Sequence, residues 1–369
     1  MLKCKNCLIP VTAPAVSIND SGICNLCQLH SSADHNKSES IRKAQEMDLE
    51  QALERSRRSS PYNALVCLSG GKDSIYLLYK LKVEYKLNVL AFTTDMNVPP
   101  VAWENIRRTI AKLDVDHLSF RPEEEFYRKF YRFLLKNQEE RGAVRTVCYV
   151  CAPLFEGYAL RAATEKGIPL VLAGYSPGQP DPERMVYEFP EHRICQTDWT
   201  PPELKNSGLF TDSELLRFWN PLRYPQGTKF PRYLAPFHAW EYHQEVNIKK
   251  VVDLDLVKNA VSASPIKSNC HLNWLLMYSD LKNLGYNPYM PEFSALIREG
   301  KASRLYWKIM MPIINTMIKY KFGLGRYVSE NLKWLNLSAE DLNITRPKKK
   351  EWDYSTNEAN SLPSAKSQE

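Results

Sequence analysis

A short apolar run that ends in two glycines and opens onto a helical pattern constrains this chain most strongly. Residues 64–68 read ALVCL, the composition of a buried strand, and residues 69–74 read SGGKDS. Apolar residues then recur at helical spacing from 73 to 83. Consecutive glycines let several backbone N–H groups converge on one oxyanion, and a helix N-terminus adds positive charge. The sequence therefore predicts a strand–loop–helix unit that binds a phosphate.

Further apolar runs extend this unit into an alternating pattern. The predicted strands are 64–68, 88–93, 117–120 and 168–174. The predicted helices are 73–83, 101–113, 123–137 and 153–166. Such alternation predicts an α/β fold with a parallel sheet and helices on both faces. Ligands bind beyond the carboxyl ends of the strands in such sheets, which is where the double glycine falls.

Two CxxC pairs stand near the start of the chain. Cys4 and Cys7 are separated by 16 residues from Cys24 and Cys27, which is the spacing of a four-thiolate zinc ribbon. A module of about 30 residues buries too little core to fold without metal, so a structural Zn²⁺ is predicted. A redox dithiol would need only one pair. Cysteine pairs in a chain that opens without an export signal favour the reducing cytoplasm.

Composition divides the chain into successive parts. Residues 175–232 contain nine prolines and little periodicity, which predicts a lid or a substrate loop. Helical patterns return at 234–245, 269–284, 290–299 and 303–320. The predicted plan is a zinc ribbon at 1–30, a connector at 31–60, a nucleotide-binding domain at 61–250 with a lid insertion near 175–232, a helical C-terminal extension at 251–335 and a disordered tail at 346–369.

The charge balance suits an anionic ligand. The net charge of +7 fits ATP, a nucleotide sugar or RNA, although part of it stands in the tail at 346–350. The most apolar late stretch, 305–318, is too short and too polar to span a bilayer. We therefore expect no membrane partner.

The double-glycine loop resembles the SGGxDS loop of the PP-loop ATP pyrophosphatases. It is not a Walker A loop, because Val66 stands where that motif needs glycine and Asp73 follows the lysine. The resemblance implies that ATP is cleaved between its α- and β-phosphates, that AMP passes to a substrate oxygen and that pyrophosphate leaves. The residues that it assigns to the phosphates are Ser69, Gly70, Gly71, Lys72, Asp73 and Ser74, of which Lys72, Asp73 and Ser74 would be catalytic and the last two would support Mg²⁺.

The same resemblance places the rest of the nucleotide. The end of the second strand would cradle the adenine near Phe92, Thr93, Thr94 and Asp95. Gly174, at the end of the fourth strand, would border the nucleotide.

The ribbon and a late segment resemble one branch of this superfamily, the N-acetyl sugar amidotransferases of surface-polysaccharide and flagellin-sugar biosynthesis. The ribbon reads CKNCLIP and DSGICNLC, and residues 284–304 include LGY and ALIREGKASR. The branch implies an amidotransferase that adenylates the N-acetyl carbonyl of a nucleotide-activated sugar and replaces its oxygen with ammonia nitrogen. No glutaminase motif is present, so a separate glutaminase would be a partner. Arg298 and Arg304 would contact a sugar phosphate, unless they are solvated surface arginines.

A third CxxC, Cys148 and Cys151, supports an alternative function. In the PP-loop tRNA 2-thiolation enzymes a CxxC stands at this position, and a distant third cysteine completes a three-thiolate site for a 4Fe-4S cluster with one open iron. Cys270 would be that third ligand, with Cys195 as a substitute. This alternative is a sulfurtransferase that acts on tRNA or on a small molecule. The competing interpretations are a second structural metal shared with Cys270 or His271, two packed thiols, and a branch feature without redox use.

A third hypothesis is a non-catalytic ATP-binding scaffold for a glutaminase. The sequence leaves open the acceptor, the choice between nitrogen and sulfur, and the oligomeric state.

Overall fold

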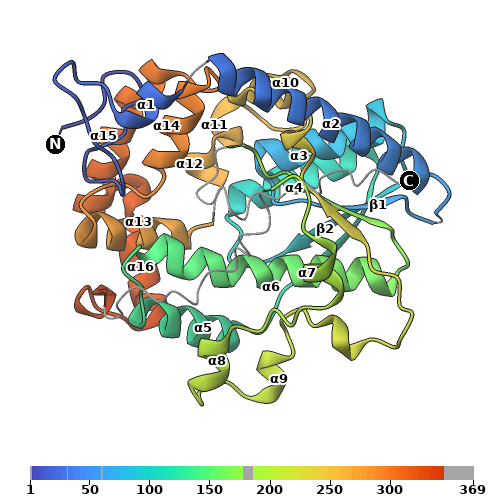
Figure 1. Ribbon diagram of the computed structural model, residues 1–369. Helices are drawn as coiled ribbons and strands as arrows, with labels where there is room; N and C mark the ends of the chain where they lie inside the picture. Colours follow the sequence, from blue (N-terminus) through green and yellow to red (C-terminus); the bar gives the residue numbers. More distant parts are fainter. Residues whose placement is uncertain (1, 31, 60, 178–185, 269, 345–369) are drawn as a thin grey trace, which may run out of the picture.

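Five parallel strands form one sheet in the computed structural model, which describes residues 2–30, 32–59, 61–177, 186–268 and 270–344. The strand order is β3-β2-β1-β4-β5. The bounds are β1 Ala64–Cys67, β2 Val89–Thr94, β3 Asp116–Phe120, β4 Leu170–Ala173 and β5 Arg232–Leu234. Helices α3 (Lys72–Tyr79) and α4 (Pro100–Leu113) lie on one side of the strands and α6 (Ala143–Glu165) on the other (Figure 1). The predicted α/β fold is confirmed.

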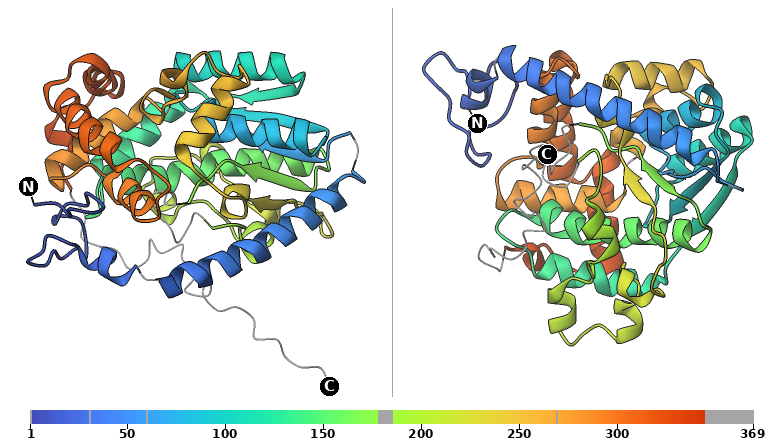
Figure 2. Two further views of the ribbon diagram at one scale, coloured as in Figure 1. Left: turned by 90° about the horizontal axis from the view of Figure 1, so that it is seen from above. Right: turned by 45° about the vertical axis from the view of Figure 1, so that its right-hand side comes forward.

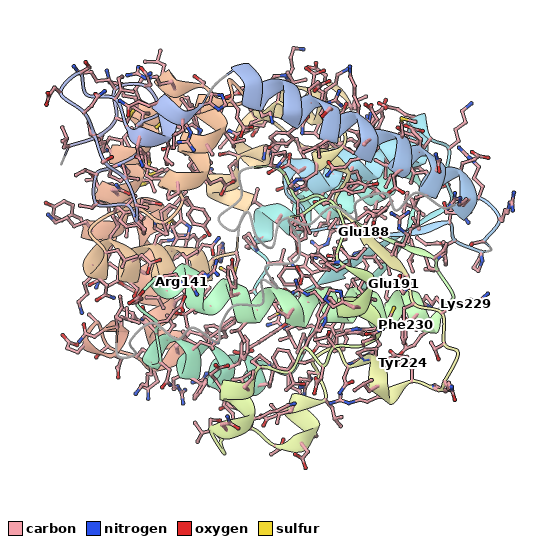
Figure 3. The ribbon with its side chains drawn as sticks, viewed as in Figure 1. Arg141, Glu188, Glu191, Tyr224, Lys229 and Phe230 are labelled. Atoms are coloured by element: carbon pink, nitrogen blue, oxygen red, sulfur yellow. The ribbon has the colours of Figure 1, made fainter. Side chains whose placement is uncertain are left out.

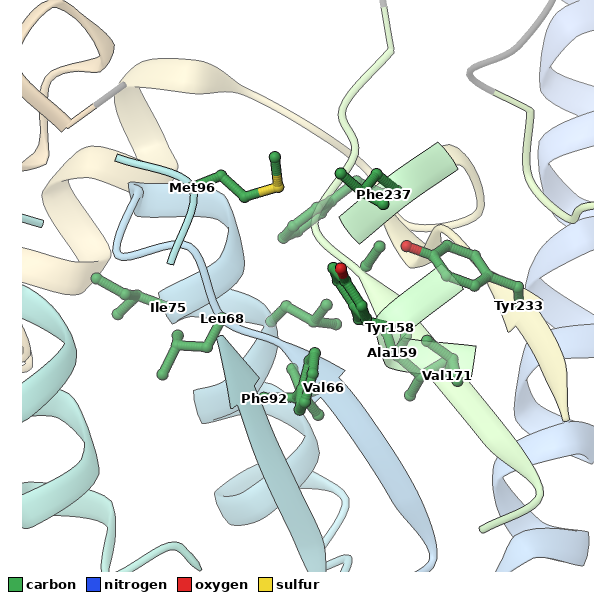
Figure 4. Packing of buried hydrophobic residues seen from close by; sticks show 14 of the residues in the cluster. Val66, Leu68, Ile75, Phe92, Met96, Tyr158, Ala159, Val171, Tyr233 and Phe237 are labelled. Atoms are coloured by element: carbon green, nitrogen blue, oxygen red, sulfur yellow. The ribbon is translucent and has the colours of Figure 1, made fainter. Parts of the chain in front are cut away.

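The central strands bury nearly every side chain. Leu65 of β1 is opposite Leu90 of β2 and Val171 of β4, and all three are buried. Strands buried on both faces read as continuous apolar runs, which is why the sequence revealed them. Figure 4 shows Val66, Phe92 and Val171 among the buried hydrophobic side chains that pack around these strands. This core fixes the edge of the sheet from which the double-glycine loop departs.

The fifth strand was not predicted. Residues 234–245 were expected to be helical, but the chain forms β5, then a 3-10 turn at Pro236–His238, and only then α10 (Gln244–Asp253). Three residues are too few for a periodic signal, and β5 exists because β4 offers its open edge from Leu170 to Leu172. The helix expected at 234–245 is therefore wrong.

Helix α6 begins ten residues before its predicted start at 153. Pro153 was taken as the first residue of the helix, where proline is most favourable, but it lies inside α6. Cys148 and Cys151 therefore lie within the helix instead of preceding it. Three residues apart on a helix, they are neighbours on one face.

The segment after β4 packs closely on the sheet. It contains α7 (Glu191–Cys195), α8 (Pro202–Asn206), α9 (Asp212–Leu215) and the turn η2 (Pro221–Arg223). Phe218 and Trp219 are fully buried, and the N–H of Phe189 donates to the carbonyl of Tyr233 in β5. Figure 3 shows Glu191, Lys229 and Phe230 of this segment on the side of the molecule away from the start of α6. That it serves as a lid stays a prediction.

The remaining helices surround this core. Residues 32–56, inside the predicted connector, form the long helix α2 (Figure 2). The other helices are α1 Asn25–Leu29, η1 Lys80–Glu84, α5 Glu124–Lys136, α11 Ala260–Ala263, α12 Pro265–Ser268, α13 Leu272–Asn283, α14 Met290–Arg298, α15 Arg304–Tyr320, η4 Gly323–Gly325, α16 Arg326–Leu335 and η5 Glu340–Leu342. No helix in the described ranges is both long and apolar enough to cross a membrane. The tail predicted at 346–369 lies outside the described residues.

Candidate functional site

The double-glycine loop lies between β1 and α3, at the carboxyl edge of the sheet. Gly70 has φ +79°, and a Cβ there would meet the backbone carbonyl of Ala102. Asn105 of α4 donates its side-chain amide to the Gly70 carbonyl at 3.0 Å. A left-handed conformation against a neighbouring backbone leaves room for glycine alone. The loop is therefore held in shape by α4 from outside.

Two serines brace the loop from inside. The backbone N–H of Ser69 donates to the hydroxyl oxygen of Ser74 at 3.1 Å, and the two hydroxyls lie 3.1 Å apart. Ser74 donates in turn to the Gly71 carbonyl at 3.0 Å. Ser74 closes the loop on itself in this arrangement, so its expected part in Mg²⁺ binding stays a prediction.

Lys72 and Asp73 form a buried ion pair at the start of α3. Their side chains are 8% and 13% exposed, and the Lys72 Nζ lies 2.6 Å from an Asp73 oxygen. Burial by itself would lower the pKa of Lys72, but the charge of Asp73, followed by that of Tyr242, outweighs burial and raises it. The side-chain amide of Asn247 in α10 donates to Asp73 at 3.2 Å. The lysine is thus a permanent cation beside the loop.

Glu292, in the first turn of α14, adds a carboxyl group to this site. Burial raises its pKa to about 8, while the charge of Lys72 lowers it and that of Asp73 raises it. A carboxyl group that titrates near neutrality beside a phosphate-binding loop can accept or hold a proton. Sequence reasoning missed Glu292, because nothing in the local pattern shows that a helix more than 200 residues later returns to the loop.

Gly174 touches the loop from the end of β4. A Cβ there would lie 2.8 Å from the backbone nitrogen of Ser74 and 3.0 Å from the carbonyl carbon of Asp73. Gly174, which was predicted to border the nucleotide, therefore lies against the double-glycine loop.

The residues expected around the adenine are engaged in the fold. The Thr93 hydroxyl donates to the Leu68 carbonyl at 2.6 Å and lies 2.8 Å from His117 Nε2. One carboxylate oxygen of Asp95 lies 2.9 Å from the Arg121 guanidinium. These side chains hold β2 to its neighbours, so any adenine contact from them needs a rearrangement or comes from the backbone.

Cys148, Cys151 and Cys270 lie near two tyrosines, the buried Tyr131 and the half-buried Tyr289. The Tyr131 hydroxyl lies 3.4 Å from the Cys151 sulfur, and burial, followed by the charges of Cys151 and Cys270, raises the pKa of Tyr131 well above its usual value. Burial, followed by the charges of Cys148, Glu292 and Cys270, likewise raises the pKa of Tyr289 well above its usual value. Chain segments more than 100 residues apart thus bring three thiols to one region.

The spacing of these sulfurs bears on the metal group they can hold. In the described part of the chain, the ribbon cysteines form the only set whose sulfurs lie within 4.8 Å of one another. Cys148, Cys151 and Cys270 are therefore too far apart to bind one ion together. Ligands of an iron–sulfur cluster bind different irons, which requires a wider set. This spacing argues against the second single-metal site that was one of the alternatives.

Asp280 of α13 anchors the helix that carries this cysteine pair. Its carboxylate accepts hydrogen bonds from the backbone N–H groups of Ala143 and Val144, the latter at 3.0 Å. It is fully buried, and burial raises its pKa to about 7, although both hydrogen bonds lower it. The C-terminal extension therefore fixes the start of α6.

The four ribbon sulfurs converge on one point. Cys4 and Cys27 sulfurs are 3.8 Å apart, and those of Cys7 and Cys24 are 3.6 Å apart. Sulfurs bound at 2.3 Å around one tetrahedral ion lie about 3.8 Å from each other. Since no disulfide joins any of the nine cysteines, this set can bind a metal ion.

Two arginines hold the ribbon to the extension. Arg298, the last residue of α14, donates to the Cys7 sulfur at 3.5 Å. Arg304, the first residue of α15, donates to the backbone carbonyls of Lys5 and Asn6 at 3.0 Å. The expectation that these arginines contact a sugar phosphate is wrong, because both guanidinium groups are used against the ribbon.

Comparison with known proteins separates the functional hypotheses. No protein-family model matches the chain. It is 32% identical over 116 residues to the tRNA-cytidine(32) 2-sulfurtransferase of Coxiella burnetii (strain CbuG_Q212), which covers 30% of this chain and 42% of that protein. It is 31% identical over 118 residues to the enzyme of the same name from Legionella pneumophila (strain Corby), which covers 30% and 38%. The chain thus spans less than half the length of these curated relatives.

Two solved structures are also similar. The U34-tRNA thiolase NcsA of Methanococcus maripaludis, solved with its 4Fe-4S cluster, aligns over 91% of this chain and 89% of its own, with a TM-score of 0.33 and 15% identity. The NMN synthetase of Francisella tularensis aligns over 83% and 97%, with a TM-score of 0.34 and 13% identity.

These findings correct the leading sequence-based function. The amidotransferase prediction, with its nucleotide-sugar substrate and glutaminase partner, is wrong, because the curated relatives are named sulfurtransferases. Together with the double-glycine loop, the sequence matches support the PP-loop ATP pyrophosphatase superfamily, and within it they favour the sulfurtransferase alternative over the amidotransferase branch.

Proposed function

We propose that this protein is an ATP-dependent sulfurtransferase that replaces a carbonyl oxygen of its acceptor, first of all a tRNA base, with sulfur. The observation that carries the proposal is the gathering of Cys148, Cys151 and Cys270 around Tyr131 and Tyr289. Tyr289 lies three residues before Glu292, whose pKa responds to the charges of Lys72 and Asp73. The turn from Tyr289 to Glu292 therefore lies between the three thiols and the double-glycine loop.

The chemistry needs both features. The carbonyl oxygen of the acceptor attacks the α-phosphorus of ATP, and pyrophosphate leaves with the electron pair of the broken P–O bond. Hydrosulfide then attacks the activated carbon, the carbon–oxygen bond breaks, AMP leaves, and the proton passes to solvent. The sum is a carbonyl, ATP and hydrosulfide converted to a thiocarbonyl, AMP and pyrophosphate, with no change of oxidation state at the acceptor carbon.

The residues of this chain divide that work. Lys72 and the N–H groups of the loop stabilise the departing pyrophosphate, and Asp73 supports its Mg²⁺. Cys148, Cys151 and Cys270 would hold a 4Fe-4S cluster, whose open iron supplies a binding place for sulfide. Asp280 keeps α6 in position, and a Zn²⁺ in the ribbon is structural, since four thiolates leave it no open site.

The test uses the full chain purified without oxygen, with ATP, sulfide and tRNA transcribed in vitro. We expect AMP, pyrophosphate and a thiolated nucleoside in equal amounts by mass spectrometry. Cys148→Ser, Cys151→Ser and Cys270→Ser should each lose the thiolated nucleoside.

Cys195→Ser is the matched control, because Cys195 lies on α7 and should retain the activity. Thiolation that survives all three substitutions, or that Cys195→Ser abolishes equally, would contradict the proposed site. ATP consumed without any thiolated product would contradict the sulfurtransferase itself.

A further inference from the structure

A pocket of about 220 Å³ opens where β2 and β3 end, beneath α16. Asn97 and Arg121 line it from the loops that follow these two strands, and His271 lines it from the start of α13. Tyr327, Asn331 and Trp334 close it from α16. The carboxyl edge of a parallel sheet is the usual place for a ligand, and here a late helix completes its walls.

The pocket borders the three-cysteine region on two sides. His271 follows Cys270 directly in the chain, and the Cys270 sulfur lies 3.6 Å from the carbonyl oxygen of Met96, the residue before Asn97. Tyr127, also in the lining, stands one helical turn before Tyr131, whose hydroxyl contacts the Cys151 sulfur. The pocket lining therefore includes the chain neighbour of Cys270, and it also includes a residue one helical turn from the tyrosine that contacts Cys151.

Flat rings and directional polar groups make up the walls. The rings of His271 and Tyr327 stack with centroids 3.9 Å apart and an interplanar angle of 21°. The indole N–H of Trp334 donates to Glu124 at 3.0 Å, which fixes the third ring. Rings held in this way offer an aromatic surface without a further loss of side-chain freedom on binding.

The polar groups can read the edge of a planar ligand. Asn331 donates from its amide nitrogen to the carbonyls of His271 and Tyr327 at 3.0 and 2.7 Å. Its carboxamide oxygen accepts no hydrogen bond within the described ranges and is available. Arg121 lines the pocket with a guanidinium group that is 60% exposed and lies 2.9 Å from an Asp95 oxygen. Donors and acceptors around aromatic walls suit a nitrogen heterocycle.

The volume of the pocket, about 220 Å³, suits a single planar base better than a base pair. A paired stem does not fit such a space, so the base must come from a single-stranded segment or be turned out of its stack.

We propose that this pocket binds the acceptor base of a single-stranded RNA segment and presents it to the Cys270 side of the sulfur site. The inference rests on the proposed function and deepens it. It assigns Arg121, Asn331 and Tyr327 to recognition of the acceptor, in place of the structural roles that a helix-packing interface would give them.

Photocrosslinking of the holoprotein to tRNA transcribed with 5-bromocytidine and 5-bromouridine tests the placement without relying on turnover. We expect the crosslinked peptides to contain residues 121–128 or 326–335. Tyr327→Ala, which removes a stacking partner, and Arg121→Gln, which removes a charged donor, should each weaken binding of the same RNA by about tenfold. Ser329→Ala, on the exposed side of α16, is the matched control and should bind as the unmodified protein does.

Two results would overturn the pocket assignment. One is crosslinking confined to other peptides with equal RNA affinity for all three variants. The other is 8-azido-ATP labelling of the same peptides in competition with the RNA, because the pocket would then belong to the adenine. If thiolation of tRNA persists in either case, the proposed function stands and this inference alone falls. Crosslinks at the pocket without thiolation would support this inference and contradict the proposed function.

Discussion

Replacement of Gly174 by alanine tests whether β4 sets the position of the phosphate loop. The added Cβ would lie 2.8 Å from the Ser74 nitrogen, whereas non-bonded carbon atoms rest about 3.5–4.0 Å apart. The contact atoms are backbone, so the loop must move by roughly half an ångström or more. Overpacking of this kind costs about 1–3 kcal/mol. For a chain of 369 residues that corresponds to a fall in Tm of about 1–4 °C.

The loss of ATP binding should exceed the loss of stability. A displacement of about 1 Å in a site can cost about 100-fold in rate, so we expect at least about tenfold weaker ATP binding by calorimetry, alongside the lower Tm. Gly208→Ala is the control, because Gly208 has φ +67° but no atom within 4 Å of its added Cβ. Backbone strain there costs about 1–2 kcal/mol and should leave ATP affinity unchanged. If Gly174→Ala binds ATP normally and melts no lower than Gly208→Ala, the contact does not position the loop.

Three further predictions address the ribbon and the contact of Asp280 with the start of α6. Cys24→Ser should release about one metal ion per chain by elemental analysis and lower the Tm, whereas equal metal content would show that the ribbon does not bind it. Arg304→Ala should hasten proteolytic cleavage within residues 2–30, because two carbonyl contacts are lost, and Lys308→Ala should not. Burial raises the pKa of Asp280 to about 7, so the folded state binds the proton more tightly than the unfolded state and the free energy of unfolding should fall as pH rises from about 4 to 7, by up to about 4 kcal/mol. Asp280→Asn should flatten this part of the pH profile in chemical denaturation, and an unchanged slope would contradict the assignment.

The sequence predicted the parts of the fold whose cause is local. The strands β1, β2 and β4 are apolar runs buried on both faces, and the double glycine follows from the conformation that Gly70 adopts. The ribbon followed from cysteine spacing, since four thiolates around one ion fix that spacing themselves. Each of these features is decided within about 30 residues.

Features decided by distant contacts were not predictable. β5 forms because β4 has an open edge, and α6 starts at Ala143 because Asp280, more than 130 residues later, accepts its first N–H groups. Glu292 reaches the phosphate loop from the C-terminal extension in the same way. The branch resemblance rested on short motifs, which do not define the acceptor, and the curated relatives that overturn it are named sulfurtransferases.

Helix α14 links the region of the double-glycine loop to the cysteine ribbon by a short path. Its first turn carries Glu292, whose pKa responds to the charges of Lys72 and Asp73, and its last residue, Arg298, donates to the Cys7 sulfur of the ribbon. Six residues of helix separate them, a span of about 9 Å. A metal ion in the ribbon would therefore hold one end of α14 in place without taking part in the reaction. Its loss would free Glu292 at the other end and abolish catalysis, while the sheet itself remained folded.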